Sequence, residues 1–480
     1  MSFLRGNLLA LGLLLMTHTG FSQVKKDTLS ENGKKDTLKL SVAQAQQYAL
    51  DNNKSILNAN LDVESAKKKI WEITASGLPQ VSGKGSFQYT PQASAIVEQF
   101  SSLGGLGYWM YNVDHYLSTQ DPSNQSFGRI PVTAPPKQTN PNDLKWSLNG
   151  TITVSQLIFS GSYLVGLQSA KVYKNLSELN QIKSRQDVLE SIANSYFNVL
   201  IAHENKMILD STYANLMKTY ADMQKMNKQG FVEETDLDQM QITVSNVKSS
   251  LDLITRMESI AKKMLNLQLG IDLNMPVILT DNLKTLVDAF TIDHLLLSDL
   301  VLDNNVNYKM LDDQVTVSAL LLKLRKAEFL PDLAAYYQYY KELNKNTISF
   351  NPPHVIGAQL SIPIFGSGMK LAKVAQARND LSKARNTKDQ MGSALMLDFE
   401  NSKSSLLTAR DKYETESNNL QLAKKIYNRS LIKYTNGMLS NIELTQVQNQ
   451  FLTAQSNYYT AIQNLITAKS KLEKTLSKTN

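Results

Sequence analysis

The sequence contains no cysteine, and this absence excludes several kinds of chemistry at once. The chain has no residue that could form a disulfide, act as a thiolate nucleophile, ligate zinc or an iron–sulfur cluster through sulfur, or carry a lipid on a cysteine. Histidine is also scarce: only five occur among 480 residues, and none stands three or four positions from another. A local histidine metal motif is therefore missing. We expect no catalytic residue, no cofactor and no metal site.

The sequence also lacks an apolar run long enough for a membrane-spanning helix. The apolar run near the N-terminus, residues 8–16, is about half of the roughly 20 residues that such a helix needs. It follows one basic residue and precedes small and polar residues that end near Ser22, which is typical of a secretory signal peptide. We predict a cleaved signal peptide at 1–22 and a flexible polar tether at 23–39, so that the mature chain leaves the cytoplasm.

Charge of one sign does not gather in one place. The net charge is +7, from 50 lysines and arginines against 43 aspartates and glutamates, and the basic residues are scattered along the chain. This distribution indicates no nucleic-acid partner.

Proline is absent from two long stretches, residues 142–275 and 364–480. Proline breaks helix interiors, and both stretches are rich in leucine, alanine, lysine and glutamine, which favour helices. Each stretch therefore predicts a long helical hairpin that turns at Gly230 or at Gly437. The first helix of each hairpin, with about 65 residues, would be on the order of 100 Å long.

The two halves of the chain resemble each other. Three motifs recur in the same order: Leu-Asp-Asn-Asn at 50–53 and 302–305, Leu-Pro at 78–79 and 330–331, and Ile-Phe at 158–159 and 364–365. The first two recur after 252 residues and the third after 206, which locates an insertion of 46 residues after Tyr89. Such self-similarity is the signature of an internal duplication. We predict two repeats, at 40–290 and 291–480.

Each predicted repeat begins with a helix and continues with two strands. A capping box at Ser41 marks the start of the first helix, and Asp293 is the expected N-cap of the second. Apolar and polar residues then alternate, a period typical of strands. The four predicted strands lie at about 80–90, 147–158, 332–341 and 355–364.

A heptad seam runs along the long helix that ends near Gly437. Large residues recur every seven positions, and small residues mostly fill the position three later, with Glu416 as the exception: Phe399, Leu406, Tyr413, Leu420, Tyr427 and Tyr434, with Ser402, Ala409, Ala423 and Ser430. This pattern is typical of a coiled coil with close backbone approach, the alternative being one stripe of an ordinary bundle core.

Four strands of about ten residues suit either a soluble sandwich or a bilayer-spanning barrel. In a membrane the sheet has to close, and four strands are too few, because small barrels begin at about eight. The chain would then have to oligomerise. Two copies would supply eight strands around a filled core, and three would supply twelve around a lumen.

These features together resemble the TolC-like outer-membrane efflux proteins. The resemblance covers about 40–480 and rests on the duplicated order of elements, the Leu-Pro pair before each repeat's first strand, the Ile-Pro-Ile-Phe-Gly-Ser-Gly run at 362–368, and the turns at Gly230 and Gly437. It implies a mainly α fold with a small β part. Three copies would form a 12-stranded β-barrel in the outer membrane, continued by a periplasmic α-barrel of long antiparallel coiled-coil helices.

By this resemblance the protein is a passive exit duct for small molecules. The implied partners are two further copies in a homotrimer, a periplasmic adaptor protein, an inner-membrane transporter that drives export, and outer-membrane lipid. One alternative is the outer-membrane component of type I protein secretion, and another is a soluble periplasmic coiled-coil scaffold without a pore. An enzyme is disfavoured: Gly161 and Gly166 have phosphate-loop spacing, but Leu167 stands where the loop needs lysine.

The resemblance also implies functional residues at the hairpin turns. Contact with the adaptor is expected at both turns: Gly230, Phe231, Val232, Gly437, Met438 and Leu439. The channel gate and its selectivity are expected at Tyr434, Glu443 and Asp236. Leu439 stands where the family has an arginine, so the family's ion-pair latch cannot form in that way, and closure would rely on Tyr434 or another contact.

The insertion at 90–146 joins the first two predicted strands and holds several aromatic residues, among them Trp109. One interpretation is an ordinary solvated loop. The functional interpretation is a lid over the barrel mouth or a docking site for a surface partner.

Overall fold

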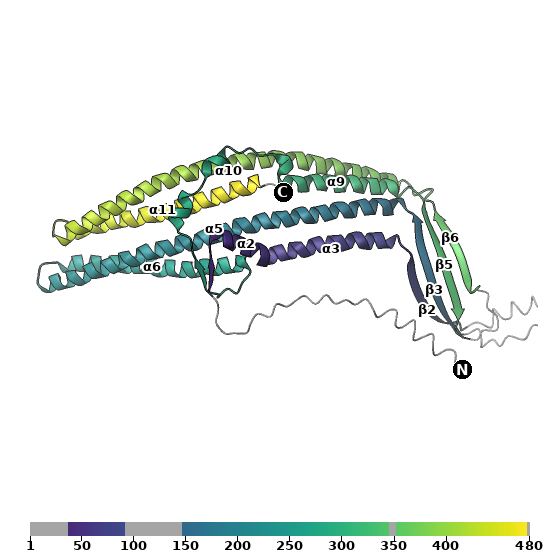
Figure 1. Cartoon of the computed structure of the whole chain (residues 1–480), viewed down its shortest axis with the longest axis horizontal. Helices are drawn as coiled ribbons and strands as arrows, with labels where there is room; N and C mark the ends of the chain where they lie inside the picture. Colours follow the sequence, from purple (N-terminus) through teal and green to yellow (C-terminus); the bar gives the residue numbers. More distant parts are fainter. Residues whose placement is uncertain (1–36, 92–145, 345–351, 478–480) are drawn as a thin grey trace, which may run out of the picture.

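The protein is elongated, with its strands at one end and the turns of two helical hairpins at the other (Figure 1). The computed structural model describes residues 37–91, 146–344 and 352–477. The predicted signal peptide at 1–22 and nearly all of the predicted loop at 90–146 lie outside the described residues.

The sheet has four antiparallel strands. Their order is β2 (Gln80–Tyr89), β3 (Trp146–Phe159), β5 (Asp332–Glu342) and β6 (His354–Ser361). The first three strands begin and end within one residue of the predicted bounds. β6 ends three residues before the predicted end at 364, because Pro363 has no N–H with which to continue the ladder.

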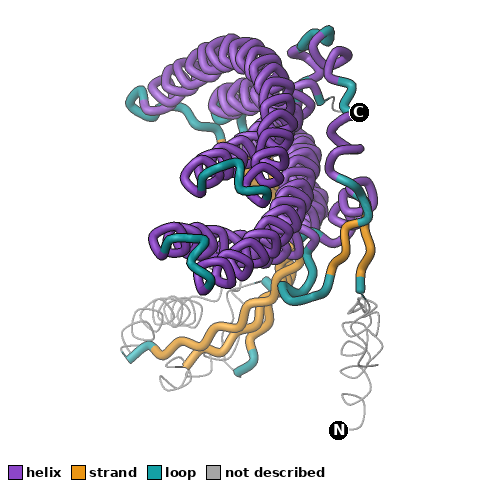
Figure 2. Tube along the Cα trace, turned by 90° about the vertical axis from the view of Figure 1, so that its left-hand side faces the viewer, coloured by secondary structure: helices purple, strands orange, loops and turns teal. Residues whose placement is uncertain are grey.

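Two long hairpins form the body of the molecule. The first pairs α5 (Gly161–Lys228) with α6 (Glu234–Leu269), and the second pairs α10 (Met369–Thr435) with α11 (Asn441–Leu476). On the strand side, α3 (Lys54–Ser76) runs beside α5 and α9 (Val306–Ala327) beside α10 (Figure 1). Seen from the turns, the helices form a curved layer (Figure 2). The predicted mainly helical fold with a small β part is confirmed.

Length alone does not make these helices membrane spans. Among the described residues, no helix combines the length and the apolar character needed to cross a bilayer. The long helices are stabilised instead by pairing along their length, since an isolated helix gains little stability in water.

The heptad seam of α10 is the buried face of the second hairpin. Large and small positions of the seam are buried together: Phe399, Leu406 and Tyr427 with Ser402, Ala409 and Ala423. Glu416 is also buried; its carboxylate lies 2.7 Å from Lys412 Nζ and accepts a hydrogen bond from Asn419. Lys412 and Asn419 compensate the buried negative charge, which explains how a glutamate can stand at a position where the seam otherwise has small residues.

A waist, residues 37–53 and 277–305, crosses the middle of the hairpins. It contains β1 (Leu38–Leu40) paired in parallel with β4 (Val277–Leu279), together with α2 (Val42–Asn52), α7 (Leu283–Asp288), α8 (Ile292–Leu296) and the 3-10 turn η2 (Leu302–Asn304). The buried Tyr196 hydroxyl of α5 joins it to the hairpin by donating to the Asp281 carboxylate, at 2.9 Å. The tether predicted at 23–39 therefore ends earlier, because Leu38 and Lys39 belong to β1.

The repeated Leu-Asp-Asn-Asn motif is a helix junction. Asn53 and Asn305 both adopt extended backbone conformations and cap the helices that follow them, α3 and α9. Their side-chain amides donate to carbonyl oxygens near the ends of the returning helices, Asn53 to Gln268 at 2.6 Å and Asn305 to Thr475 at 3.1 Å. Each asparagine thus ties the start of a strand-side helix to the end of a hairpin.

The expected N-cap at Asp293 is wrong. Asp293 lies inside the short helix α8, and the strand-side helix of the second repeat begins only after Asn305. The Asn305 side chain accepts from the backbone N–H groups of Asn307 and Tyr308, and this capping decides where the helix starts. The capping box at Ser41 is confirmed, although its helix ends at Asn52.

Gly270, the residue that ends α6, provides a test of this junction. Its φ is +76°, and a Cβ there would overlap the carbonyl oxygen of Asn52. Gly270→Ala should therefore lower the melting temperature of the purified protein strongly, with a free-energy cost of about 3 kcal/mol or more. Gly230→Ala is the matched control: its φ is +80° but nothing lies near its Cβ, so only the backbone cost of roughly 1–2 kcal/mol applies. Equal losses in the two variants would contradict the close approach at Gly270.

Candidate functional site

The sheet has one apolar face and one polar face. Its register places the following side chains on the first face: Val81, Phe87, Leu148, Ile152, Val154, Tyr337, Ile356 and Leu360. The opposite face carries Ser82, Lys84, Gln88, Thr151, Thr153, Gln338 and Gln359. All of these side chains except the half-buried Val154 are exposed in the described chain, and Ile356 is 85% exposed. Such a sheet suits lipid on one side and water on the other.

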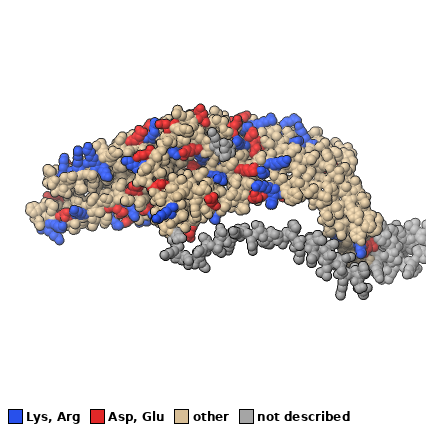
Figure 3. All heavy atoms as spheres, viewed as in Figure 1, with Lys and Arg blue, Asp and Glu red and all other residues tan. Residues whose placement is uncertain are grey.

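Aromatic side chains gather at the end of the apolar face farthest from the helices. The rings of Tyr89 and Trp146 lie 4.4 Å apart, and those of Tyr339 and His354 lie 5.1 Å apart. Aromatic girdles of this kind mark the borders of a membrane's apolar layer. The sheet end of the molecule also shows few charged side chains on the face drawn in Figure 3.

The described sheet is open on both sides. β2 and β6 are its outer strands, and neither has a second strand neighbour within the described residues. Unpaired backbone groups cannot remain in contact with lipid, because no water is present to satisfy them. A sheet with this apolar face therefore needs partner strands from outside the described chain.

At the other end of the molecule, two glycines make the hairpin turns. Gly230 and Gly437 have φ of +80° and +73°, and the next N–H donates back into the preceding helix in both turns. This geometry is the usual αL helix ending. The two turns are the same local structure, as the repeat predicts.

The four apolar residues of the turns fall into two pairs. Phe231 and Met438 project into solvent, with 76% and 67% of their surface exposed. Val232 and Leu439 are half-buried against the core of the hairpins, so their apolar character is explained by packing. Of these four residues, only Phe231 and Met438 are left without cover from other described residues.

Tyr434 and Asp236 lie near each other at this end. Burial raises the pKa of the Tyr434 hydroxyl, and the negative charge of Asp236 raises it further. The backbone carbonyl of Asp236 also accepts from the Asn441 side chain at 2.8 Å, which links α6 to α11. Two of the three predicted gate residues are thus brought together from different hairpins.

Glu443, the third predicted gate residue, has a local structural role. Its carboxylate accepts from the backbone N–H and the hydroxyl of Ser440, completing a capping box at the start of α11. These hydrogen bonds hold the pKa of Glu443 below its ordinary value. Capping does not remove the charge, so Glu443 still adds a carboxylate to the turn.

Sequence reasoning missed a buried carboxylate between α5 and α6. Glu258 is 6% exposed, and its oxygens lie 2.6 Å from Lys262 Nζ, 3.1 Å from His203 Nδ1 and 3.7 Å from Lys206 Nζ. Burial raises the pKa of Glu258, but its cationic partners outweigh burial and leave the pKa lowered. The i, i+4 spacing to Lys262 was visible in the sequence, whereas the two partners on α5 depend on the hairpin register.

The sequence matches the family described as Outer membrane efflux protein over residues 45–270 and 299–477, which together make up most of the chain. The chain belongs to the outer membrane efflux protein family. Membership accounts for the apolar sheet face, places this efflux protein in the outer membrane with its helices in the periplasm, and identifies it as a channel protein rather than an enzyme.

Solved channels share the fold of this efflux protein at low sequence identity. The Campylobacter jejuni CmeC outer membrane channel is 16% identical with a TM-score of 0.67, over 91% of this chain and 85% of that one. The Vibrio cholerae outer membrane protein VceC is 14% identical with a TM-score of 0.65, over 91% and 96%. The open-state Neisseria gonorrhoeae MtrE channel is 14% identical with a TM-score of 0.62, over 91% and 88%. No curated protein sequence matches the chain.

Proposed function

We propose that three copies of this efflux protein join their sheets into one twelve-stranded barrel in the outer membrane. Their helical hairpins continue the barrel as a tunnel through the periplasm. The tunnel is the passive exit duct of a tripartite system for small molecules, and an inner-membrane transporter drives export through a periplasmic adaptor. The observation that carries this proposal is the two-faced sheet with two open edges.

Closure explains why three copies are needed. Joining β6 of one copy to β2 of the next satisfies both open edges without any further element. A barrel of about eight strands is filled by its own side chains, whereas more strands leave a lumen. Twelve strands would turn the polar face, with Lys84, Thr151 and Gln338, toward water inside the barrel.

The number of copies and their contacts can be tested by cross-linking. The natural chain has no cysteine, so any disulfide must join introduced cysteines. One cysteine replaces Gln88 on β2, and each variant carries a second cysteine at a different position of β6. We expect detergent to extract the protein from outer membranes. At one or more of the β6 positions, the cross-linked product should contain three chains. Variants with a single cysteine are the control and should give no such product. Protein that is freely soluble in the periplasmic fraction, or cross-linked products no larger than a dimer at every β6 position, would contradict the proposal.

The turns form the periplasmic entrance in this proposal. Phe231 and Met438 are exposed apolar residues of the two turns that an adaptor could contact, and Asp236, Tyr434 and Glu443 each lie within five residues of one of them in the sequence. Three copies would place six carboxylates, from Asp236 and Glu443, around one constriction. Like charges in a confined space attract cations and exclude anions.

Ion selectivity tests this carboxylate ring. We expect the wild-type channel in a planar bilayer to be cation-selective, and Asp236→Asn with Glu443→Gln to shift the reversal potential in a salt gradient toward zero. Block by multivalent cations should weaken as well. Glutamine at 443 preserves the capping box, since Gln and Glu both serve at that position. Asp411→Asn with Glu414→Gln, farther along α10, is the matched control; an equal shift in both double variants would mean that the ring is not at the entrance.

A further inference from the structure

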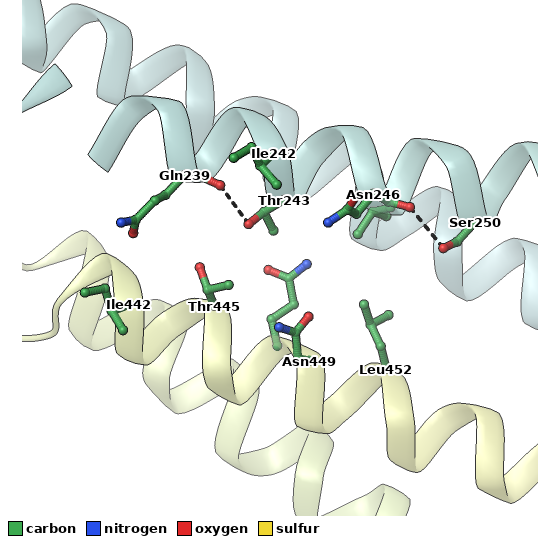
Figure 4. A pocket seen from close by; sticks show the side chains of 11 residues that line it. Gln239, Ile242, Thr243, Asn246, Ser250, Ile442, Thr445, Asn449 and Leu452 are labelled. Carbon is green, nitrogen blue, oxygen red and sulfur yellow. Dashed lines mark hydrogen bonds between the residues drawn. The ribbon is translucent and has the colours of Figure 1, made fainter. Parts of the chain in front are cut away.

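A polar cleft separates the two hairpins near the entrance. It lies between α6 and α11 and has a volume of about 640 Å³. In Figure 4 the side chains of Thr243 and Asn246 on α6 lie opposite those of Thr445 and Asn449 on α11. None of the eleven residues that line the cleft is charged, although charged residues make up 19% of the chain.

Gln448 is the most unusual residue of this cleft. Its side chain is on α11 and the residue is only 1% exposed, yet neither its amide nitrogen nor its amide oxygen has a hydrogen-bond partner within the described residues. The hydroxyl of Thr445, one helical turn away, is also buried without a hydrogen-bond partner within the described residues. A buried unpaired amide is expensive, about 1–3 kcal/mol for each group, so such groups are normally satisfied in proteins.

The amide nitrogens one heptad away on α11 do have partners in the first hairpin, although the amide oxygens of Asn441 and Gln455 have none within the described residues. Asn441 donates to the Asp236 carbonyl at 2.8 Å, and Gln455 donates to the Asn205 side chain at 2.6 Å. Amides at these two positions therefore bridge the hairpins directly. At Gln448, between them, the hairpins are separated by the cleft and the bridge is missing.

The internal repeat shows what a glutamine at this position does when it is satisfied. The counterpart of Gln448 in the first repeat, 207 residues earlier, is Gln241, and the counterpart of Tyr427 is Tyr220. The Tyr220 hydroxyl donates to the Gln241 side chain at 3.3 Å. In the second repeat, the Tyr427 hydroxyl is buried without a partner, as is the Gln448 amide. The same pair of residues is bonded in one hairpin and unbonded in the other.

We propose that the cleft between α6 and α11 is a binding site for an uncharged ligand with a peptide group, recognised by Gln448. An amide side chain offers one donor and one acceptor next to each other, and a peptide group offers the complementary pair. The Gln448 Nε2–H would donate to the ligand carbonyl, and its Oε1 would accept from the ligand N–H. The absence of charge in the lining excludes an ionic contact as the basis of recognition and favours a neutral ligand.

The test uses two small probes that differ at one amide. N-methylacetamide, called the methylamide below, is a single peptide group, and methyl acetate, called the ester, has an oxygen in place of the N–H and therefore no peptide group. We expect saturation-transfer NMR on the detergent-solubilised full chain to show methylamide binding, with an affinity about fivefold or more above that of the ester, which is the usual effect of one hydrogen bond.

Two variants distinguish recognition by Gln448 from non-specific binding of the probe. Gln448→Leu should lose methylamide binding by about fivefold or more and, because it removes an unpaired amide from a buried site, should raise the melting temperature. Gln446→Leu, at an exposed position outside the cleft lining, should change neither. The melting temperature also shows whether each variant is folded.

Three results would overturn the proposal. If neither probe binds the wild-type chain, water satisfies Gln448. If methylamide and ester bind equally, no amide is recognised. If Gln448→Leu binds as the wild type does, the probe sits elsewhere. None of these results bears on the trimeric duct, which is tested by cross-linking.

Discussion

Export should be abolished when Phe231 and Met438 are both replaced by glutamate, while the protein still reaches the outer membrane as trimers. The two side chains are the exposed apolar groups of the two turns, and neither supports the hairpin core. Glutamate there would place charges where a partner buries apolar surface, and an unpaired charge in a desolvated contact is strongly unfavourable. Susceptibility of a reporter strain to exported compounds, with trimer abundance measured in parallel, checks the expectation.

A matched control separates docking from a general effect of charge. Met207→Glu with Met264→Glu introduces the same two charges at exposed methionines of the first hairpin, far along the chain from both turns. This pair should leave export close to wild type. Full export with glutamates at 231 and 438 would contradict the proposal that these residues contact the adaptor. Loss of trimers would show that the turns are needed for assembly instead.

The second large effect is expected at the apolar face of the sheet. Ile356→Arg on β6 would present a cation to lipid, at about 2–4 kcal/mol per copy near the membrane centre. Gln359→Arg, three residues away on the same strand, points to the opposite face and should be tolerated in a water-filled lumen. The yield of folded trimer in outer membranes should fall strongly for the first variant and little for the second.

Reconstituted channels add a second measurement to this pair. Gln359→Arg should shift ion selectivity toward anions, since three added cations would line the lumen. A reverse result, with Gln359→Arg failing to insert and Ile356→Arg inserting normally, would mean that the sheet faces have been assigned the wrong way round.

Elements whose signal is local and repeated could be predicted from the amino-acid sequence alone. The missing prolines in 142–275 and 364–480 predicted the long hairpins, because nothing in those stretches interrupts helical hydrogen bonding. Alternation along the strands predicted which side chains share a face, because strand side chains point to opposite sides in turn. The positions of Gly230 and Gly437 predicted the turns and therefore the end of the molecule at which an entrance would lie.

Features that depend on residues far apart in the chain could not be predicted in this way. Asp293 and Asn305 are both acceptable N-caps in sequence. In the structure Asn305 caps α9, and its side chain also contacts the distant Thr475 carbonyl. Val232 and Leu439 look like exposed turn residues until the neighbouring helix covers them. Gln448 follows the same heptad as Asn441 and Gln455, so no local pattern separates it from them. Its difference lies in the distance between the two hairpins, which is set by packing along helices hundreds of residues apart in the chain rather than by the residues next to it.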